Sequence, residues 1–159
     1  MEGMTLLELL VVIAIVAVII AVGLPSYFAI GRGSKMRNAV VGVVDEINAA
    51  RGWAIAMRKS AYVVFDQYQG TYQTHIKGNV LDVYRTPQPI RLPDTTSFYS
   101  GAPTPDHQSP PAYIRCKPDG SMCNENDDRM FWFIVWQPEK DKARKIFIDG
   151  TYGRVKSNL

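Results

Sequence analysis

The chain begins with a long apolar segment that contains few polar positions. Between residues 9 and 31 no side chain carries a charge. A helix over residues 6–24 would be roughly 28 Å long at about 1.5 Å per residue, which matches the hydrocarbon core of a bilayer. The pattern therefore predicts a helix whose first half crosses a membrane. Pro25 follows directly, and a proline inside a helical pattern predicts a kink.

Beyond Pro25 the apolar residues return at steps of three and four, the spacing of one helix face. The predicted face consists of Met36, Val40, Val43, Ile47, Ala50, Ala54 and Met57. Charged residues lie between these positions, Glu46 and Arg51 among them. Residues 26–60 are therefore expected to form the second half of the long helix, with its apolar face packed against a sheet.

After Ser60 the pattern changes to the alternation typical of strands, with glycines at the turns. The expected strands lie at residues 61–67, 71–77, 80–85, 112–116, 130–137, 143–149 and 152–156. Residues 93–111 contain five prolines and no strand pattern, so we expect a long loop there. The expected fold class is α+β: a long N-terminal helix, transmembrane in its first half, whose second half packs on an antiparallel β-sheet head.

The apolar segment contains one acid, Glu8, close to its start. A carboxylate within a membrane is unfavourable by about 2–4 kcal/mol at the centre and is normally paired with a cation. No lysine or arginine of this chain lies within reach along the same helix. The nearest cation would be the α-amino group of Met4, if the chain were cleaved before it. The alternative is a carboxylate that is solvated near the lipid headgroups.

The residues Gly3-Met4-Thr5-Leu6-Leu7-Glu8, followed by LLVVIAIVAVIIAVGLP, resemble the class III signal of type IV prepilins and type II secretion pseudopilins. The resemblance implies cleavage between Gly3 and Met4 by a membrane prepilin peptidase and N-methylation of Met4. It also implies that Glu8 pairs with a neighbouring subunit's amino terminus during assembly. Two features depart from the family: Met4 replaces the usual phenylalanine, and the three-residue leader contains no lysine or arginine.

Three stretches of the remaining chain are similar to FimT/GspH-type minor pilins. They are AARGWAIAMRKSAYVVF, IRCKPDGSM and KIFIDGTYGRVK. The resemblance implies a leader at 1–3, a transmembrane and assembly helix at 4–25, a head-packing half of the helix at 26–60 and a β-rich head at 61–159. The partners that it implies are other major and minor pilins or pseudopilins, the prepilin peptidase, an inner-membrane assembly platform and inner-membrane lipid before assembly.

Two cysteines, Cys116 and Cys123, flank the turn sequence Pro118-Asp119-Gly120, which would place the thiols across a tight loop. We expect a disulfide between them, which requires an oxidising compartment. The alternative is two reduced thiols in a cytoplasmic head, and the positive-inside rule favours it because basic residues follow the apolar segment and none precedes it. Together with the prepilin resemblance, the cysteines favour a single-pass inner-membrane protein with a periplasmic head, later part of a pilus or pseudopilus.

Candidate catalytic chemistry is sparse. His75 and His107 have no partners at metal-binding spacings, and the sequence contains neither a Gly-rich phosphate loop nor a G-x-S-x-G elbow. The acidic residues 124–128 lack the alternation of an EF-hand, so we favour a solvated turn over a calcium site. We expect no enzyme, no cofactor and no metal.

The C-terminal segment is basic, although the net charge of the chain is only +3. Arg154 and Lys156 would face the same way in an extended strand, toward one phosphate backbone. In FimT-type pilins a Gly-Arg-x-Arg motif in this tail is implicated in binding DNA for uptake. Here lysine stands at its last position, which keeps the charge but loses the bidentate fork. With Arg144 and Lys145, these residues are the candidate DNA contacts; the alternative is a solvated or subunit-contacting basic edge.

The expected function is that of a non-catalytic minor pilin, incorporated into a type IV pilus, where it primes assembly or lies at the tip. One alternative is a minor pseudopilin of a type II secretion system. Another is a DNA-binding pilin for DNA uptake. An adhesive role at the tip rests only on the long 93–111 loop.

Overall fold

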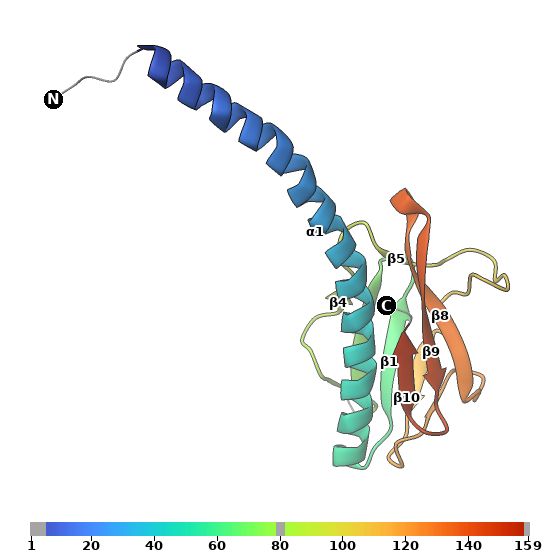
Figure 1. Cartoon of the computed structure of the whole chain (residues 1–159). Helices are drawn as coiled ribbons and strands as arrows, with labels where there is room; N and C mark the ends of the chain where they lie inside the picture. Colours follow the sequence, from blue (N-terminus) through green and yellow to red (C-terminus); the bar gives the residue numbers. More distant parts are fainter. Residues whose placement is uncertain (1–5, 79–81, 158–159) are drawn as a thin grey trace. The chain divides into compact units, whose positions relative to one another are not determined.

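The computed structural model describes residues 6–78 and 82–157, without the side chains of residues 22–34 and 140. Within these ranges a single long helix, α1 (Leu6–Met57), precedes a β-rich region, and a short 3-10 helix, η1 (Pro138–Lys140), interrupts the strands. The chain is therefore α+β (Figure 1). It divides into two compact units, Met1–Ser34 and Lys35–Leu159.

The predicted transmembrane half of the helix is wrong. Over the described residues, no helix combines the length and the apolar character that crossing a membrane requires. Pro25 lies within α1, and its kink stays a prediction.

The second half of α1 buries one apolar face, as the helical period predicts. Its buried residues are Met36, Ala39, Val40, Val43, Ile47, Ala50 and Ala54. They form one hydrophobic cluster with side chains from the strands, among them Val63, Ile114 and Phe133. Figure 1 shows this part of α1 running alongside β1 (Ala61–Asp66). The predicted face extends one turn too far, because Met57 is 53% exposed.

The strands form two antiparallel sheets. Sheet A has the order β3-β2-β1-β6-β7, with β4 also paired to β2, and sheet B has the order β10-β9-β8-β5. The remaining strands of sheet A are β2 (Thr71–Ile76), β3 (Val83–Tyr84), β4 (Ile90–Arg91), β6 (Tyr113–Cys116) and β7 (Met122–Cys123). Those of sheet B are β5 (Ser97–Phe98), β8 (Met130–Gln137), β9 (Lys142–Asp149) and β10 (Arg154–Ser157). Both sheets contribute to the cluster that α1 covers.

The region between residues 93 and 111 is not entirely a loop. It contains β5, in which Phe98 is buried and pairs with Val135 of β8. A strand of two residues among prolines is too short to show alternation, so the sequence pattern misses it. Of the predicted strand at 80–85, residues 80–81 lie outside the described residues, and within 82–85 the strand is only β3, of which both residues are exposed.

An ion pair between a buried carboxylate and an exposed arginine joins α1 to sheet A. The Glu46 carboxylate accepts a hydrogen bond from Oγ1 of Thr74 at 2.6 Å and another from Nε of Arg85 at 2.8 Å. A second guanidinium nitrogen, Nη2 of Arg85, donates a hydrogen bond to the other carboxylate oxygen of Glu46. The helical pattern groups Glu46 with the exposed charges, but it is buried. Its partners lie far along the chain, so only the fold brings them together.

Removing one partner of this pair should destabilise the fold strongly. Arg85→Ala leaves the Glu46 carboxylate buried with one neutral partner, and an uncompensated buried charge costs about 3–5 kcal/mol. We expect a loss of about 3 kcal/mol in the free energy of unfolding, measured by urea denaturation. Adding Glu46→Met to Arg85→Ala should recover most of this loss, because the charge itself is then gone.

The matched control is Arg91→Ala, which removes an exposed arginine from β4 of the same sheet. Its effect should stay within about 0.5 kcal/mol, as for most surface substitutions. Equal effects of Arg85→Ala and Arg91→Ala would show that the ion pair does not hold α1 to the sheet.

Candidate functional site

Three surfaces carry the candidate functional residues, and the first is the N-terminal end of α1. Every leucine, valine and isoleucine between residues 6 and 20 is exposed, by 46–81%. Glu8 lies in the first turn of α1, where the helix dipole stabilises a negative charge. The predicted cleavage and methylation site, Gly3-Met4, lies outside the described residues. This end of the helix thus presents apolar surface and one acid to its surroundings.

The second surface is the outer face of sheet B. Arg154 and Lys156 alternate with half-buried Val155, which packs against the core, so both basic side chains point outward from β10. The register places Lys156 opposite Phe147 of β9, and alternation puts Lys145 on the same face. The predicted common orientation of Arg154 and Lys156 is therefore confirmed.

Aromatic rings lie between these cations. The Nζ of Lys145 is 4.5 Å from the centroid of the Trp132 ring and 3.3 Å from Oδ1 of Asp106. Lys145, Lys156, Trp132 and Phe147, with Pro105, line an open pocket of about 440 Å³. Trp132 is half-buried rather than a core residue, so part of its side chain is exposed to solvent. We call this surface the basic face.

The fourth predicted DNA contact lies elsewhere. Arg144 pairs with Val135 in the register of β8 and β9, whereas Lys145 pairs with Ile134. Neighbouring residues of a strand point to opposite faces, so Arg144 is on the face opposite Lys145. The structure brings Lys145, Arg154 and Lys156 together and leaves Arg144 outside the set.

Close packing explains why glycine stands at position 153, next to Arg154. A side chain at Gly153 would lie 2.4 Å from Nε of Arg51 and 2.6 Å from the carbonyl oxygen of Gly120. The same Nε donates a hydrogen bond to that oxygen at 2.8 Å. The guanidinium of Arg51 thus joins α1 to the Pro-Asp-Gly turn and lies close against Gly153 of the C-terminal hairpin. Sequence reasoning missed this contact, because no local signal joins an arginine of the helix to two distant glycine turns.

The predicted disulfide is not formed: Cys116 and Cys123 are both free cysteines. Cys116 pairs with Met122 and Cys123 with Arg115, an offset of one residue. The two side chains therefore point to opposite faces of sheet A: Cys116 belongs to the hydrophobic core, and Sγ of Cys123 lies 3.4 Å from Nε of Arg115. The cysteines consequently give no support to a periplasmic head.

The acidic residues 124–128 form a turn that satisfies its own polar groups. The side-chain oxygen of Asn124 accepts hydrogen bonds from the backbone N–H groups of Asn126 and Asp128. Asp127 pairs with Arg115 of the adjacent strand. Among the residues with described positions, no group of three His, Cys, Asp or Glu side chains gathers as a metal site would require.

The third surface lies on the outer face of sheet A and was not anticipated from the sequence. Four rings follow one another across β6, β1, β2 and β3: Tyr113, Tyr62, His75 and Tyr84. Successive ring centroids are 5.6, 5.6 and 5.5 Å apart. We call this row the aromatic strip. Its signal in the sequence is weak, because single aromatic residues in alternating strands are ordinary.

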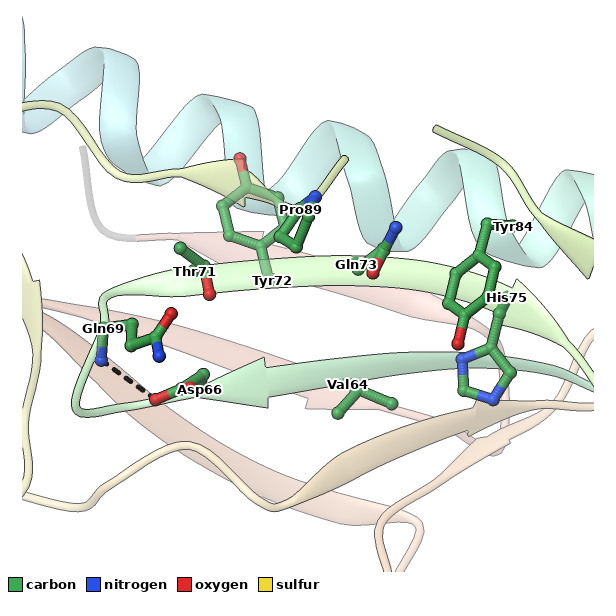
Figure 2. Close-up of a pocket in the computed structure, with 9 residues that line it drawn as sticks. All are labelled: Val64, Asp66, Gln69, Thr71, Tyr72, Gln73, His75, Tyr84 and Pro89. Atoms are coloured by element: carbon green, nitrogen blue, oxygen red, sulfur yellow. Dashed lines mark hydrogen bonds between the residues drawn. The ribbon is translucent and has the colours of Figure 1, made fainter. Parts of the chain in front are cut away.

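A shallow pocket adjoins the aromatic strip (Figure 2). It has a volume of about 360 Å³, and its walls include His75 and Tyr84 together with polar side chains from the β1–β2 turn. Oδ1 of Asp66 accepts hydrogen bonds from the backbone N–H groups of Tyr68 and Gln69, which fixes the carboxylate. Nε2 of Gln73 donates to the carbonyl oxygen of Thr86, which fixes the amide. The pocket is therefore built of groups that are already oriented.

Burial raises the pKa of the Cys116 thiol to about 12, above the roughly 8.5 of an exposed thiol. The folded protein therefore retains this proton between about pH 9 and pH 12, where the unfolded chain loses it, so stability should fall as pH rises through this range. At pH 8 we expect Ellman's reagent to react slowly with both thiols of the native protein. In urea without reductant it should find two thiols per chain.

A sample reduced beforehand provides the control and should give the same two thiols in urea. If the unreduced sample gave none while the reduced sample gave two, the disulfide would be present and the strand register of β6 and β7 would be wrong.

The comparisons with known proteins identify no relative of this chain. No family model matches the chain, and neither a curated protein nor a solved structure matches it. Any assignment of function therefore rests on the residues and their arrangement.

Proposed function

We propose that this protein is a non-catalytic minor pilin, incorporated into a type IV pilus, where it primes assembly or lies at the tip. The observation that carries the proposal is the exposed apolar surface of α1 over residues 6–20. Contiguous apolar surface of this kind normally marks an interaction site. The resemblance of residues 3–8 to a prepilin signal supports the same interpretation.

The shape of this surface favours a bundle of helices as its environment. Apolar side chains occupy consecutive positions, so they surround the helix instead of forming one stripe. A helix that is apolar all round is normally buried on all sides. Burying one leucine, valine or isoleucine side chain contributes about 1.5–3 kcal/mol. Several neighbouring helices of the same kind would cover the whole circumference, as a single partner would not.

In such a bundle, Glu8 would fix how neighbouring helices align along their axes. Within the apolar bundle, its carboxylate would be stabilised by the α-amino group of a neighbouring subunit whose leader has been removed. Electrostatic pairs of this kind select partners and fix their alignment more than they add affinity. Other major and minor pilins or pseudopilins are therefore the proposed partners, with a prepilin peptidase and an assembly platform acting before the pilus or pseudopilus forms.

The head remains available for other contacts in this arrangement. Residues 35–157 contain the hydrophobic cluster and both sheets, whereas the exposed apolar side chains of residues 6–20 lie in the other compact unit. A subunit of this design joins a filament through its helix and displays its sheets.

A charge placed on the apolar surface should block assembly without unfolding the head. In Ile13→Asp, the new carboxylate would lie in the bundle unpaired, and burying it costs several kcal/mol. Since about 1.4 kcal/mol is a factor of ten, we expect incorporation into sheared filaments to fall at least tenfold, measured by immunoblot against the cell fraction. Glu8→Ala should reduce incorporation as well while leaving leader cleavage intact.

The control is Ile55→Asp, on the same helix at a position that is 46% exposed in the head. It should be incorporated normally. Normal incorporation of Ile13→Asp, or equal loss for both variants, would contradict assembly through residues 6–20.

The basic face supports a second candidate function, DNA binding for uptake. Lys145, Arg154 and Lys156 lie on one side of sheet B, beside the rings of Trp132 and Phe147. Cations that point the same way suit a phosphate backbone, and exposed rings add stacking surface for unpaired bases. Lys145 is partly neutralised by Asp106, so we expect modest affinity.

The salt dependence of duplex DNA binding tests this role. With two to three phosphate contacts, the logarithm of the binding constant should fall against the logarithm of salt concentration with a slope of about −2 to −3. The double variant Arg154→Ala/Lys156→Ala should reduce the slope by about 2. Arg144→Ala, on the opposite face, is the matched control and should leave it unchanged. Equal effects of the two variants would remove the basic face from DNA binding.

A further inference from the structure

The aromatic strip lies outside the hydrophobic core. The core-facing ring of β1, Phe65, is buried on the other side of sheet A. On the outer side, Tyr84 is 50% exposed and Val64 is 40% exposed. These side chains present ring and methyl surface to solvent, where the helix–sheet packing does not need them.

Two pockets lie along the strip and share Val64 and His75 as a common wall. The first is the one shown in Figure 2, where Asp66 and Gln69 lie at one end and His75 and Tyr84 at the other. The second, also about 360 Å³, is lined by Tyr62, Tyr113, Lys77 and Asp82. Polar side chains thus stand at the margins of both pockets, with the rings between them. An elongated ligand could occupy both.

We propose that the aromatic strip and its two pockets bind a neutral saccharide. A sugar ring offers C–H bonds on one face, and these pack against the electron-rich faces of aromatic rings. Its hydroxyls project around the edge and need both donors and acceptors, which carboxylate, amide and imidazole groups supply. A concave site with aromatic walls and a few placed polar groups is the usual form of a small-ligand site.

The polar groups are held in place before any ligand arrives. Asp66 and Gln73 are fixed by the hydrogen bonds to the turn and to Thr86. Nε2 of His75 lies 3.6 Å from Oδ2 of Asp82, and the His75 ring stacks on Tyr62 at an interplanar angle of 20°. Side chains that are already oriented lose little freedom on binding, which favours a weakly binding ligand such as a sugar.

The charges of this surface favour a neutral ligand. Asp66 and Asp82 are offset only by Lys77 among the described residues that line the two pockets, so an anion such as nucleic acid would not be attracted. Val64 and Pro89 are the only aliphatic side chains lining them in the described ranges. Hydroxyl, amide and carboxylate groups form most of the remainder, as a ligand rich in hydroxyls requires. The proposal is independent of how the helix assembles and gives the displayed head a ligand.

The test uses the purified full chain and a panel of neutral sugars: glucose, galactose, N-acetylglucosamine, maltose, cellobiose and lactose. Each is added to about 10 mM, ten times a dissociation constant of about 1 mM, while aromatic NMR resonances are recorded. We expect at least one sugar to shift the ring signals of Tyr62, His75 and Tyr84 saturably. Raising the salt from about 50 to about 200 mM should leave this binding unchanged, in contrast to binding of DNA.

Variants assign the binding to the strip. Tyr84→Ala removes an exposed ring from a two-residue strand and should weaken sugar binding about tenfold, the upper range for one aromatic contact. Tyr84→Phe keeps the ring, so its affinity should stay within a factor of about three of the wild type. Tyr152→Ala, an exposed ring near sheet B, is the matched control and should bind as the wild type does. Circular dichroism confirms that each variant is folded.

Three results would overturn the proposal. The first is a panel in which no sugar shifts these rings. The second is a shift confined to Trp132 and Phe147, which would move the site to the basic face. The third is a change in the association state of the chain in Tyr84→Ala without any sugar binding in the wild type, which would make the strip a contact between copies of this chain.

Discussion

The packing of the second half of α1 against the strands is the interaction on which the rest of the structure depends. Alanine and valine dominate its buried face, so the helix backbone can approach the sheets closely. This face belongs to one hydrophobic cluster that includes strands of both sheets. The ion pair between buried Glu46 and Arg85 adds orientation to an otherwise apolar contact, because it forms in only one alignment of helix and sheet. The outer faces of the sheets are thereby left for other contacts.

Near its start, the same helix carries apolar surface that the sheets do not cover. Apart from Glu8, the side chains over residues 6–20 are apolar and exposed, so the hydrophobic effect favours their burial by other molecules. The two sheet surfaces differ from this one and from each other. Sheet B presents cations and rings, whereas the aromatic strip of sheet A is close to neutral. A subunit that assembles through its helix would display both surfaces, and their different charge suits different ligands.

Sequence reasoning succeeded where a regular period decided the structure and failed where distant residues decided it. The 3.6-residue period located the buried face from Met36 to Ala54, and the period of two located the longer strands and the common face of Arg154 and Lys156. It missed β5, which is too short to show a period, and the burial of Glu46, whose partner lies 39 residues away. The disulfide failed because an offset of one residue sends two nearby side chains to opposite faces. The transmembrane prediction was wrong because, over the described residues, no helix is both long and apolar enough to cross a membrane.

The central claim is that residues 6–21 are covered by other subunits, and hydrogen exchange tests it most directly. Backbone amides of a helix without packing partners exchange readily, because such a helix is only marginally stable. We expect residues 6–21 to exchange quickly in the isolated chain, while residues 36–54 are protected by the sheets. In assembled filaments, residues 6–21 should gain about a hundredfold protection or more. Exchange of residues 6–21 at the same rate in filaments and in the isolated chain would contradict the account.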